Sequence, residues 1–193
     1  MRVPLIDGHN DLPYVIRKDR NAKGDVAAYG LDQLHAEVDT DIPRMQAGKL
    51  AGQFFAAYVP PNQPNPAGFA PAQIALMRDI LKRHADVFRP GLSADDVEAA
   101  KAEGRIALFM TIENGAAVDG ELDALNAYYD LGVRLMTLCH NDTTDWCDSA
   151  TDAPRHNGLT GFGKDVLRRM NKLGMVIDLA HVAPKVMHDA LDV

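Results

Sequence analysis

The feature that most restricts the fold of this chain is an order of segments that recurs along it. A segment with helical spacing ends at a glycine, an apolar run follows, and polar residues come next. The run at residues 106–112 is too continuously apolar for a strand with one face in water, which indicates a strand buried on both faces. Helices that alternate with such strands are typical of βαβ units, in which right-handed crossovers build a parallel sheet.

We count about five strands in this order, with helical patterns between most of them. The strand segments are LID, AGQFFAAYVPP, RIALFMTIENG, VRLMTLCHND and MVIDLAHV. The pattern PAQIALMRDILKRHADVF predicts a helix after Pro71, with five residues at helical spacing, namely Ile74, Met77, Leu81, His84 and Phe88. Ser93 and Asp96 form a capping-box pattern that starts a further helix. The sequence therefore predicts the α/β fold class.

Side chains of the kind that bind metals follow four of the predicted strands. His9 and Asp11 lie two residues apart in LIDGHNDLP, and an extended segment puts such residues on one face. Glu113, His140 and His181 follow the third, fourth and fifth strands. In a parallel α/β barrel the carboxyl ends of all strands open on one face, so these residues would meet there. They predict a two-metal hydrolytic centre, with Glu113 bridging the ions and His181 on the opposite side.

Each of these residues also has a structural interpretation without a metal. Asp11 would cap the helix LPYVIRK, and His9 would be a hydrogen-bonded histidine near the sheet edge. Glu113 would cap the following turn, and His181 would start the helix APKVMHDALD. The metal site is favoured because four ligand-type residues fall at the same end of successive predicted strands.

The remaining histidines and the two cysteines lack this placement. We expect surface or helix-face positions for three histidines and leave a fourth, in a loop, undecided; these are His35, His84, His188 and His156. Cys139 and Cys147 are too few for a four-cysteine zinc site, and Cys147 is interpreted as an ordinary loop thiol. One local disulfide would fit only an exported protein. Any metal site must therefore rest mainly on histidine and carboxylate.

Charge and hydropathy exclude other classes of protein. The formal net charge is −7, and no run of lysine and arginine suggests a surface for nucleic acid or anionic membranes. No apolar run approaches the roughly 18 residues of a membrane span, and the N-terminus lacks the apolar core of a signal peptide. We expect a cytoplasmic protein with no nucleic-acid partner and no membrane span. The oligomeric state is left open, a homodimer included.

Five blocks of the sequence carry a resemblance to a known family. They are IDGHNDLP, AGQFFAAYVP, TIENG, RLMTLCHND with Trp146 soon after, and LGMVIDLAHV. They resemble the zinc-dependent membrane (renal-type) dipeptidase family and its bacterial relatives, from near residue 5 to the last residues. The resemblance implies a (β/α)8-barrel-like fold, a TIM barrel, with a binuclear zinc site that hydrolyses dipeptides.

The resemblance also implies a role for each candidate residue. His9 and Asp11 would bind one zinc ion, Glu113 would bridge both ions, and His181 would bind the other. His140 would contact the substrate near the scissile carbonyl or its tetrahedral intermediate. A second histidine for the second zinc, and an arginine and an aspartate that orient substrate and handle protons, would lie beyond this sequence.

We therefore expect residues 1–193 to be a single domain, the N-terminal portion of a barrel that continues beyond Val193. We expect this part alone to show little or no dipeptidase activity. One alternative is another barrel amidohydrolase, acting on cyclic amides or esters, which typically shows H-x-H on its first strand and often a bridging modified lysine. Asp11 in place of the second histidine, and Glu113 at the bridging place, favour the dipeptidase. The other alternative is a metal-binding fragment without catalysis.

Overall fold

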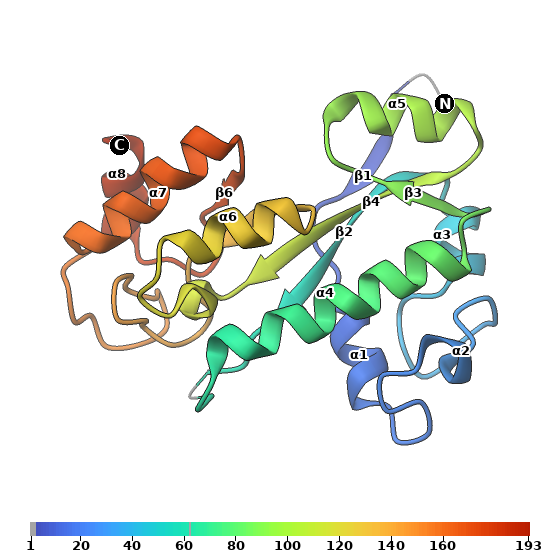
Figure 1. Ribbon diagram of the computed structural model, residues 1–193, viewed down its shortest axis with the longest axis horizontal. Helices are drawn as coiled ribbons and strands as arrows, with labels where there is room; N and C mark the ends of the chain where they lie inside the picture. The colour runs from blue at the N-terminus through green and yellow to red at the C-terminus, as the bar shows by residue number, and fades with distance from the viewer. Residues whose placement is uncertain (1–2, 62) are drawn as a thin grey trace. The chain divides into compact units, whose positions relative to one another are not determined.

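The computed structural model describes residues 3–61 and 63–193 (Figure 1). The chain divides into two compact units, of which the first comprises Met1–Ala57 with Ala72–Met110 and the second Tyr58–Pro71 with Thr111–Val193. The strand β4 (Ile106–Glu113) contributes residues to both units. Among the described residues, no helix combines the length and the apolar character needed to cross a bilayer.

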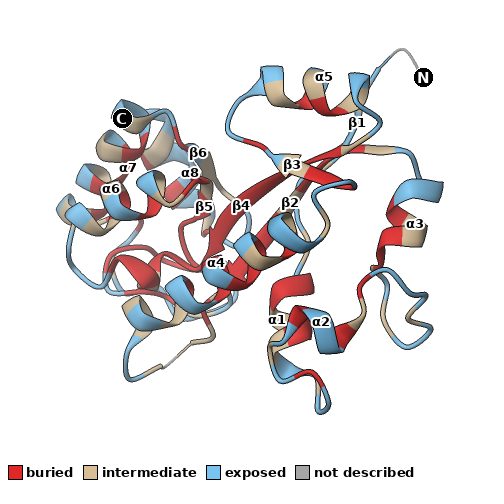
Figure 2. Ribbon diagram, turned by 45° about the vertical axis from the view of Figure 1, so that its right-hand side comes forward, coloured by how far each residue is buried: buried red, intermediate tan, exposed pale blue. Residues whose placement is uncertain are grey.

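Parallel strands form the centre of the first unit. β1 (Leu5–Asp7) pairs in parallel with β2 (Leu50–Tyr58), and β3 (Phe88–Pro90) pairs in parallel with β4. β2 and β4 are neighbours in the sheet. All eight residues of β4 are buried, as the red colour of this strand shows in Figure 2. This burial confirms the prediction of a strand covered on both faces.

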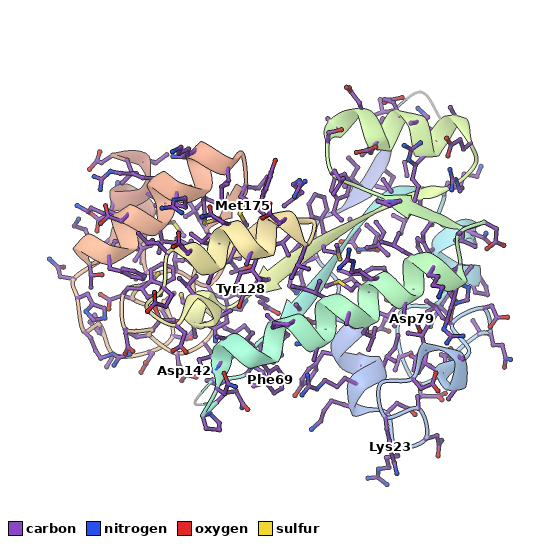
Figure 3. The ribbon with its side chains drawn as sticks, in the orientation of Figure 1. Lys23, Phe69, Asp79, Tyr128, Asp142 and Met175 are labelled. Atoms are coloured by element: carbon purple, nitrogen blue, oxygen red, sulfur yellow. The ribbon has the colours of Figure 1, made fainter. Side chains whose placement is uncertain are left out.

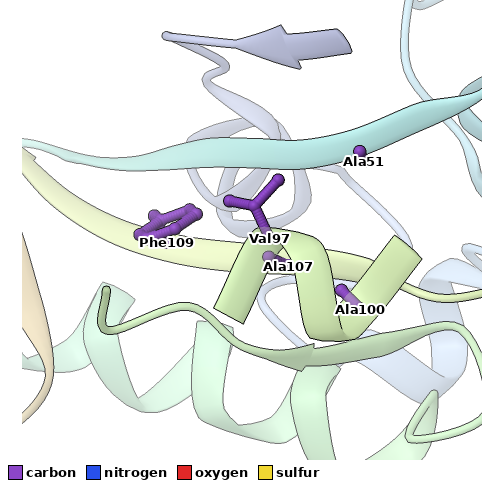
Figure 4. Close-up of a cluster of buried hydrophobic side chains, with 5 residues drawn as sticks. All are labelled: Ala51, Val97, Ala100, Ala107 and Phe109. Carbon is purple, nitrogen blue, oxygen red and sulfur yellow. The ribbon is translucent and has the colours of Figure 1, made fainter. Parts of the chain in front are cut away.

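One face of this sheet is covered by α5 (Ala94–Ala102). Val97 and Ala100 of this helix form a buried cluster with Ala51 of β2 and with Ala107 and Phe109 of β4 (Figure 4). Four of the five side chains are small or β-branched, which lets the helix approach the strands closely. The predicted capping box starts this helix. The carboxylate of Asp96 accepts a hydrogen bond from the backbone N–H of Ser93 at 2.9 Å.

Further helices of the first unit are α1 (Leu12–Lys18), α2 (Val26–Tyr29) and α3 (Ile42–Ala47), and α4 (Pro66–Arg83) has its larger part there. The prediction for α4 was wrong at both ends. The helix begins before Pro71 and stops at Arg83, and Phe88 is the first residue of β3. Phe88 is buried against Phe55, with 6.2 Å between the ring centroids. A buried residue just after a helix fits helical and strand spacing alike. The sequence pattern therefore extended the predicted helix beyond its true end.

The second unit repeats the same order of elements. β5 (Val133–Thr137) lies next to β4 in the sheet and pairs in parallel with β6 (Val176–Asp178). The helical elements are η1 (Gly115–Val118), α6 (Asp123–Asp130), α7 (Gly161–Leu173) and α8 (Pro184–Leu191). α6 and α7 pack against each other (Figure 1). Tyr128 of α6, labelled in Figure 3, donates a hydrogen bond to the carbonyl of Ala117 at 2.9 Å.

The predicted order of helix, glycine and strand is present in the structure. The expected burial of the last strand was wrong, because β6 ends the sheet among the described residues and its Val176 is 52% exposed. Gly174, at the end of α7, adopts the left-handed conformation with φ of 74°, which favours glycine and turns the chain into β6. Each of the five expected strands occurs. Within the described residues β3 is a sixth strand, which the sequence pattern did not reveal.

Candidate metal centre

Two imidazole side chains of the second unit converge on one carboxylate oxygen of the same unit. Glu113 is the last residue of β4, and its side chain is 5% exposed. Its Oε1 lies 3.6 Å from Nε2 of His140, which follows β5, and 3.7 Å from Nε2 of His181, which follows β6. The two imidazole rings are 4.4 Å apart between centroids. The strand ends thus bring together three residues that the sequence placed at a common edge.

These distances fit a metal ion. Zinc binds histidine nitrogen and carboxylate oxygen at about 2.0–2.2 Å, so two ligand atoms on one ion are at most about 4.4 Å apart. The two distances from the Glu113 oxygen fall within that limit, and one ligand atom from each of Glu113, His140 and His181 lies within 4.8 Å of the others. The donor set of one carboxylate and two imidazoles also suits zinc.

The backbone around Glu113 is fixed by the end of β2. The backbone N–H of Val59 donates to the carbonyl of Glu113 at 3.0 Å. The next residue, Asn114, has a left-handed φ of 89°, and its side chain donates to the Val59 carbonyl at 2.9 Å while accepting from the N–H of Ala116 at 3.1 Å. Asn114, and not Glu113, therefore caps the turn η1. The structural interpretation of Glu113 as a cap was wrong.

His181 also has an unusual backbone conformation, with φ of 66°. Residues other than glycine rarely adopt this region, and those that do cluster at functional sites, where surrounding contacts hold them. His181 does not start a helix, because α8 begins at Pro184 with Ala183 as its N-cap. The alternative interpretation of His181 as a helix start is therefore excluded.

Tyr58, at the end of β2, contacts the other side of the His140 ring. Its hydroxyl lies 3.5 Å from His140 Nδ1, and the two rings meet edge to face with centroids 4.9 Å apart. This contact leaves Nε2 as the nitrogen that faces Glu113. Tyr58 was not recognised from the sequence, where it is simply the last residue of an apolar strand.

His9 and Asp11 lie together in the first unit. Nε2 of His9 is 3.6 Å from Oδ2 of Asp11, so the pair offers a nitrogen and an oxygen at a spacing that suits one ion. Asp11 precedes α1 without a side-chain hydrogen bond that caps it, and Asn10 instead accepts from the N–H of Leu12 at 2.9 Å. Both candidate ligands line a pocket of about 400 Å³ within this unit. Their convergence with Glu113 stays a prediction.

The remaining histidines and cysteines have other surroundings. His35 stacks on Tyr29 with 4.3 Å between centroids, and Nε2 of His156 lies 3.0 Å from the carbonyl of Thr144. Both cysteines are free and buried, Cys139 and Cys147. None of these residues belongs to the Glu113 group.

The loop after β5 forms part of a pocket of about 520 Å³ in the second unit. Its lining includes Asn114, which follows Glu113, and Asp142, two residues after His140. It also includes Trp146 and Phe162, whose rings meet edge to face with 6.4 Å between centroids. Asp142 is labelled in Figure 3. The buried Trp146 thus gives this pocket an aromatic wall.

Asp148 holds the backbone of this loop in place through hydrogen bonds. Its buried carboxylate accepts hydrogen bonds from the backbone N–H groups of Arg155 at 2.8 Å, His156 at 3.0 Å and Gly158 at 2.9 Å. Burial alone would raise the pKa of Asp148, but these hydrogen bonds stabilise the charged form and hold the pKa below its usual range.

We expect Asp148→Asn to lower the free energy of unfolding at pH 7 by about 1–3 kcal/mol, because an amide cannot accept all of these hydrogen bonds. The folded pKa is depressed, so the contribution is fully present above the unfolded value of about 3.9 and is lost as pH falls through the folded value. The difference between wild type and variant should therefore shrink below about pH 4. Urea unfolding at pH 7 and pH 3 measures it. Asp145→Asn is the control, because that side chain is 99% exposed, and equal losses in both variants would refute the role.

Comparison with known proteins identifies the family to which the whole chain is similar. The model of the family described as membrane dipeptidase, peptidase family M19, matches residues 1–193. An uncharacterized dipeptidase from Schizosaccharomyces pombe is 36% identical over 205 residues, which are 98% of this chain and 49% of that protein. The chain thus spans about half the length of this curated relative.

Two solved structures share the fold. The dipeptidase AC, a metallopeptidase of family M19, is 25% identical with a TM-score of 0.84 and covers 100% of this chain and 60% of its own. A metallopeptidase from Rhodobacter sphaeroides, solved with a phosphinate mimic of the dipeptide L-Ala-D-Ala, is 23% identical with a TM-score of 0.84 over 98% of this chain and 62% of its own. These similarities confirm the predicted fold, an α/β chain that resembles the first part of a TIM-barrel-like metallohydrolase.

Proposed function

Because this chain belongs to the membrane dipeptidase family, peptidase family M19, we propose that the whole protein hydrolyses the peptide bond of dipeptides at a centre with two zinc ions. The observation that carries the proposal is the convergence of His140 and His181 on one oxygen of the buried Glu113 carboxylate. The dipeptide mimic held by the Rhodobacter sphaeroides relative supports this class of substrate.

Each candidate ligand has a proposed place in this centre. His9 and Asp11 would hold one zinc ion, His181 would hold the other, and the Glu113 carboxylate would bridge them. The 3.6 Å spacing within the first pair and the 3.7 Å spacing between Glu113 and His181 support this division. When bound, the zinc ions supply Lewis acidity and lower the pKa of the attacking water.

His140 is proposed to contact the substrate. If the Tyr58 hydroxyl donates to Nδ1, the proton of the imidazole resides on Nε2, which then acts as a hydrogen-bond donor. Such a positioned donor stabilises the negative charge that develops on the carbonyl oxygen during attack. The distance from Glu113 also fits His140 as a metal ligand. The resemblance to the family supports the contact with substrate. Zinc content and turnover of a His140 variant distinguish this role from that of a metal ligand.

The relatives are longer than this chain, which supports a longer whole protein. We propose that residues 1–193 are the N-terminal portion of one barrel domain, and that further chain supplies a second histidine, an arginine and an aspartate. With Glu113 and His181 alone the second zinc ion has two protein ligands, and catalytic zinc normally has three. The two free cysteines support the expected cytoplasmic location.

The experiment is hydrolysis of a simple dipeptide by the purified whole protein. We expect turnover that a chelator abolishes and that added zinc restores, with little or no turnover by residues 1–193 alone. Cyclic amides and esters are assayed in parallel. Turnover of these compounds without dipeptide hydrolysis would indicate another barrel amidohydrolase, and zinc binding without any turnover would indicate a metal-binding protein.

A further inference from the structure

The loops that carry His140 and His181 are joined by a short antiparallel bridge. Ser149, in the loop after β5, forms this bridge with Val182, in the loop after β6. Beside it the backbone N–H of Ala150 donates to the carbonyl of His181 at 2.8 Å. The two histidines are therefore connected through residues that are not themselves candidate ligands.

The side chain of Ser149 lies at the centre of this connection. Ser149 is 2% exposed, and its Oγ is 2.8 Å from the carbonyl oxygen of His140, 3.0 Å from that of Asn141 and 3.4 Å from that of His181. A hydroxyl has one proton to donate, so it serves one of these acceptors at a time. The shortest distance assigns that proton mainly to His140, with the His181 carbonyl within reach.

His181 depends on such contacts more than an ordinary residue does. Its φ of 66° is a conformation that persists only where the surroundings hold it. The N–H of Ala150 and the hydroxyl of Ser149 both reach its carbonyl oxygen. These contacts fix the peptide plane next to the imidazole that approaches Glu113.

We infer that Ser149 is a positioning residue, which fixes the backbones of His140 and His181 relative to each other so that both imidazoles reach Glu113. The value of this coupling for zinc and substrate rests on the proposed function, whereas the alignment itself does not. Displacements well below an ångström matter in such centres, because ligand geometry must be held within about 0.5 Å.

The alignment is tested on the whole protein, freed of zinc, by imidazole NMR spectra of Ser149→Ala. We expect the ring resonances of His140 and His181 to shift together, and those of His188, exposed on α8, to stay unchanged. Thr160→Ala is the matched control, because it removes a hydroxyl of the same unit whose partner is the backbone N–H of Gly163, at 3.1 Å. Resonances of both histidines that do not move, or movement of only one, would overturn the inference.

Zinc affinity, measured by competition with a chromophoric chelator, is the second readout. We expect a weakening of about tenfold or more in Ser149→Ala, the range seen when groups that orient a metal ligand are removed. Ser149→Cys, kept reduced, has a weaker donor and should lie between wild type and alanine; it also serves if the alanine variant does not fold. Unchanged affinity in folded variants of a zinc-binding wild type would contradict the inference. If the wild type binds no zinc, the proposed centre fails, and the imidazole spectra alone decide the role of Ser149.

Discussion

Replacing Glu113 with glutamine is expected to lower zinc occupancy at both positions of the centre. One bridging carboxylate would serve two ions, so the loss of its negative charge weakens both together. The amide has nearly the same shape, so the fold should persist at this buried position. We expect the affinity to fall by at least about 100-fold, the upper end of the effect seen for residues that only support a ligand.

The measurement is the zinc content of the folded whole protein after dialysis against a chelator of known affinity. Glu121→Gln is the matched control, because it makes the same chemical change at an exposed position of the same unit. Loss of one ion with the other retained would assign Glu113 to a single zinc. Full occupancy in folded Glu113→Gln would exclude it as a ligand.

His140→Ala is expected to retain zinc and to lose on the order of 10²–10³ in kcat, as for a typical donor to a developing oxyanion. The variant keeps the Glu113 carboxylate and the His181 imidazole. It loses the hydrogen-bond donor at Nε2 of His140. KM should change less than kcat, because the lost hydrogen bond is strongest in the transition state.

Turnover of a dipeptide and zinc content are measured on the same preparations of the whole protein. His188→Ala is the control, since His188 is exposed on α8. Zinc loss together with normal turnover per bound metal would reverse the assignment and make His140 a ligand. A kcat within a few-fold of wild type, with zinc retained, would leave His140 without either role.

The sequence predicted the elements that hold the candidate centre because their signals are local. A continuously apolar run such as that of β4 indicates burial on both faces, and the ligand-type residue at its end then has a defined place. Glu113, His140 and His181 could be assigned to one edge for this reason, and the structure brings them together. Their roles stay predictions.

The features that the sequence did not reveal depend on contacts between distant segments. Phe88 satisfies helical and strand spacing equally, and its pairing with Ile106 of β4 and its packing against Phe55 decide for β3. Tyr58 and Ser149 are common residue types whose importance lies in what they touch, His140 in both cases, 82 and 9 residues away along the chain. No pattern of neighbours in the sequence specifies such a contact.

The claim that Glu113 bridges two zinc ions is tested most directly by X-ray diffraction from crystals of the whole protein grown with zinc, recorded on both sides of the zinc absorption edge. We expect two anomalous peaks about 3.5–4 Å apart, the spacing of two-metal hydrolytic sites. One peak should lie at His9 and Asp11, the other at His181, and each should contact one oxygen of Glu113. A single peak, or two peaks that do not share Glu113, would contradict the bridging role.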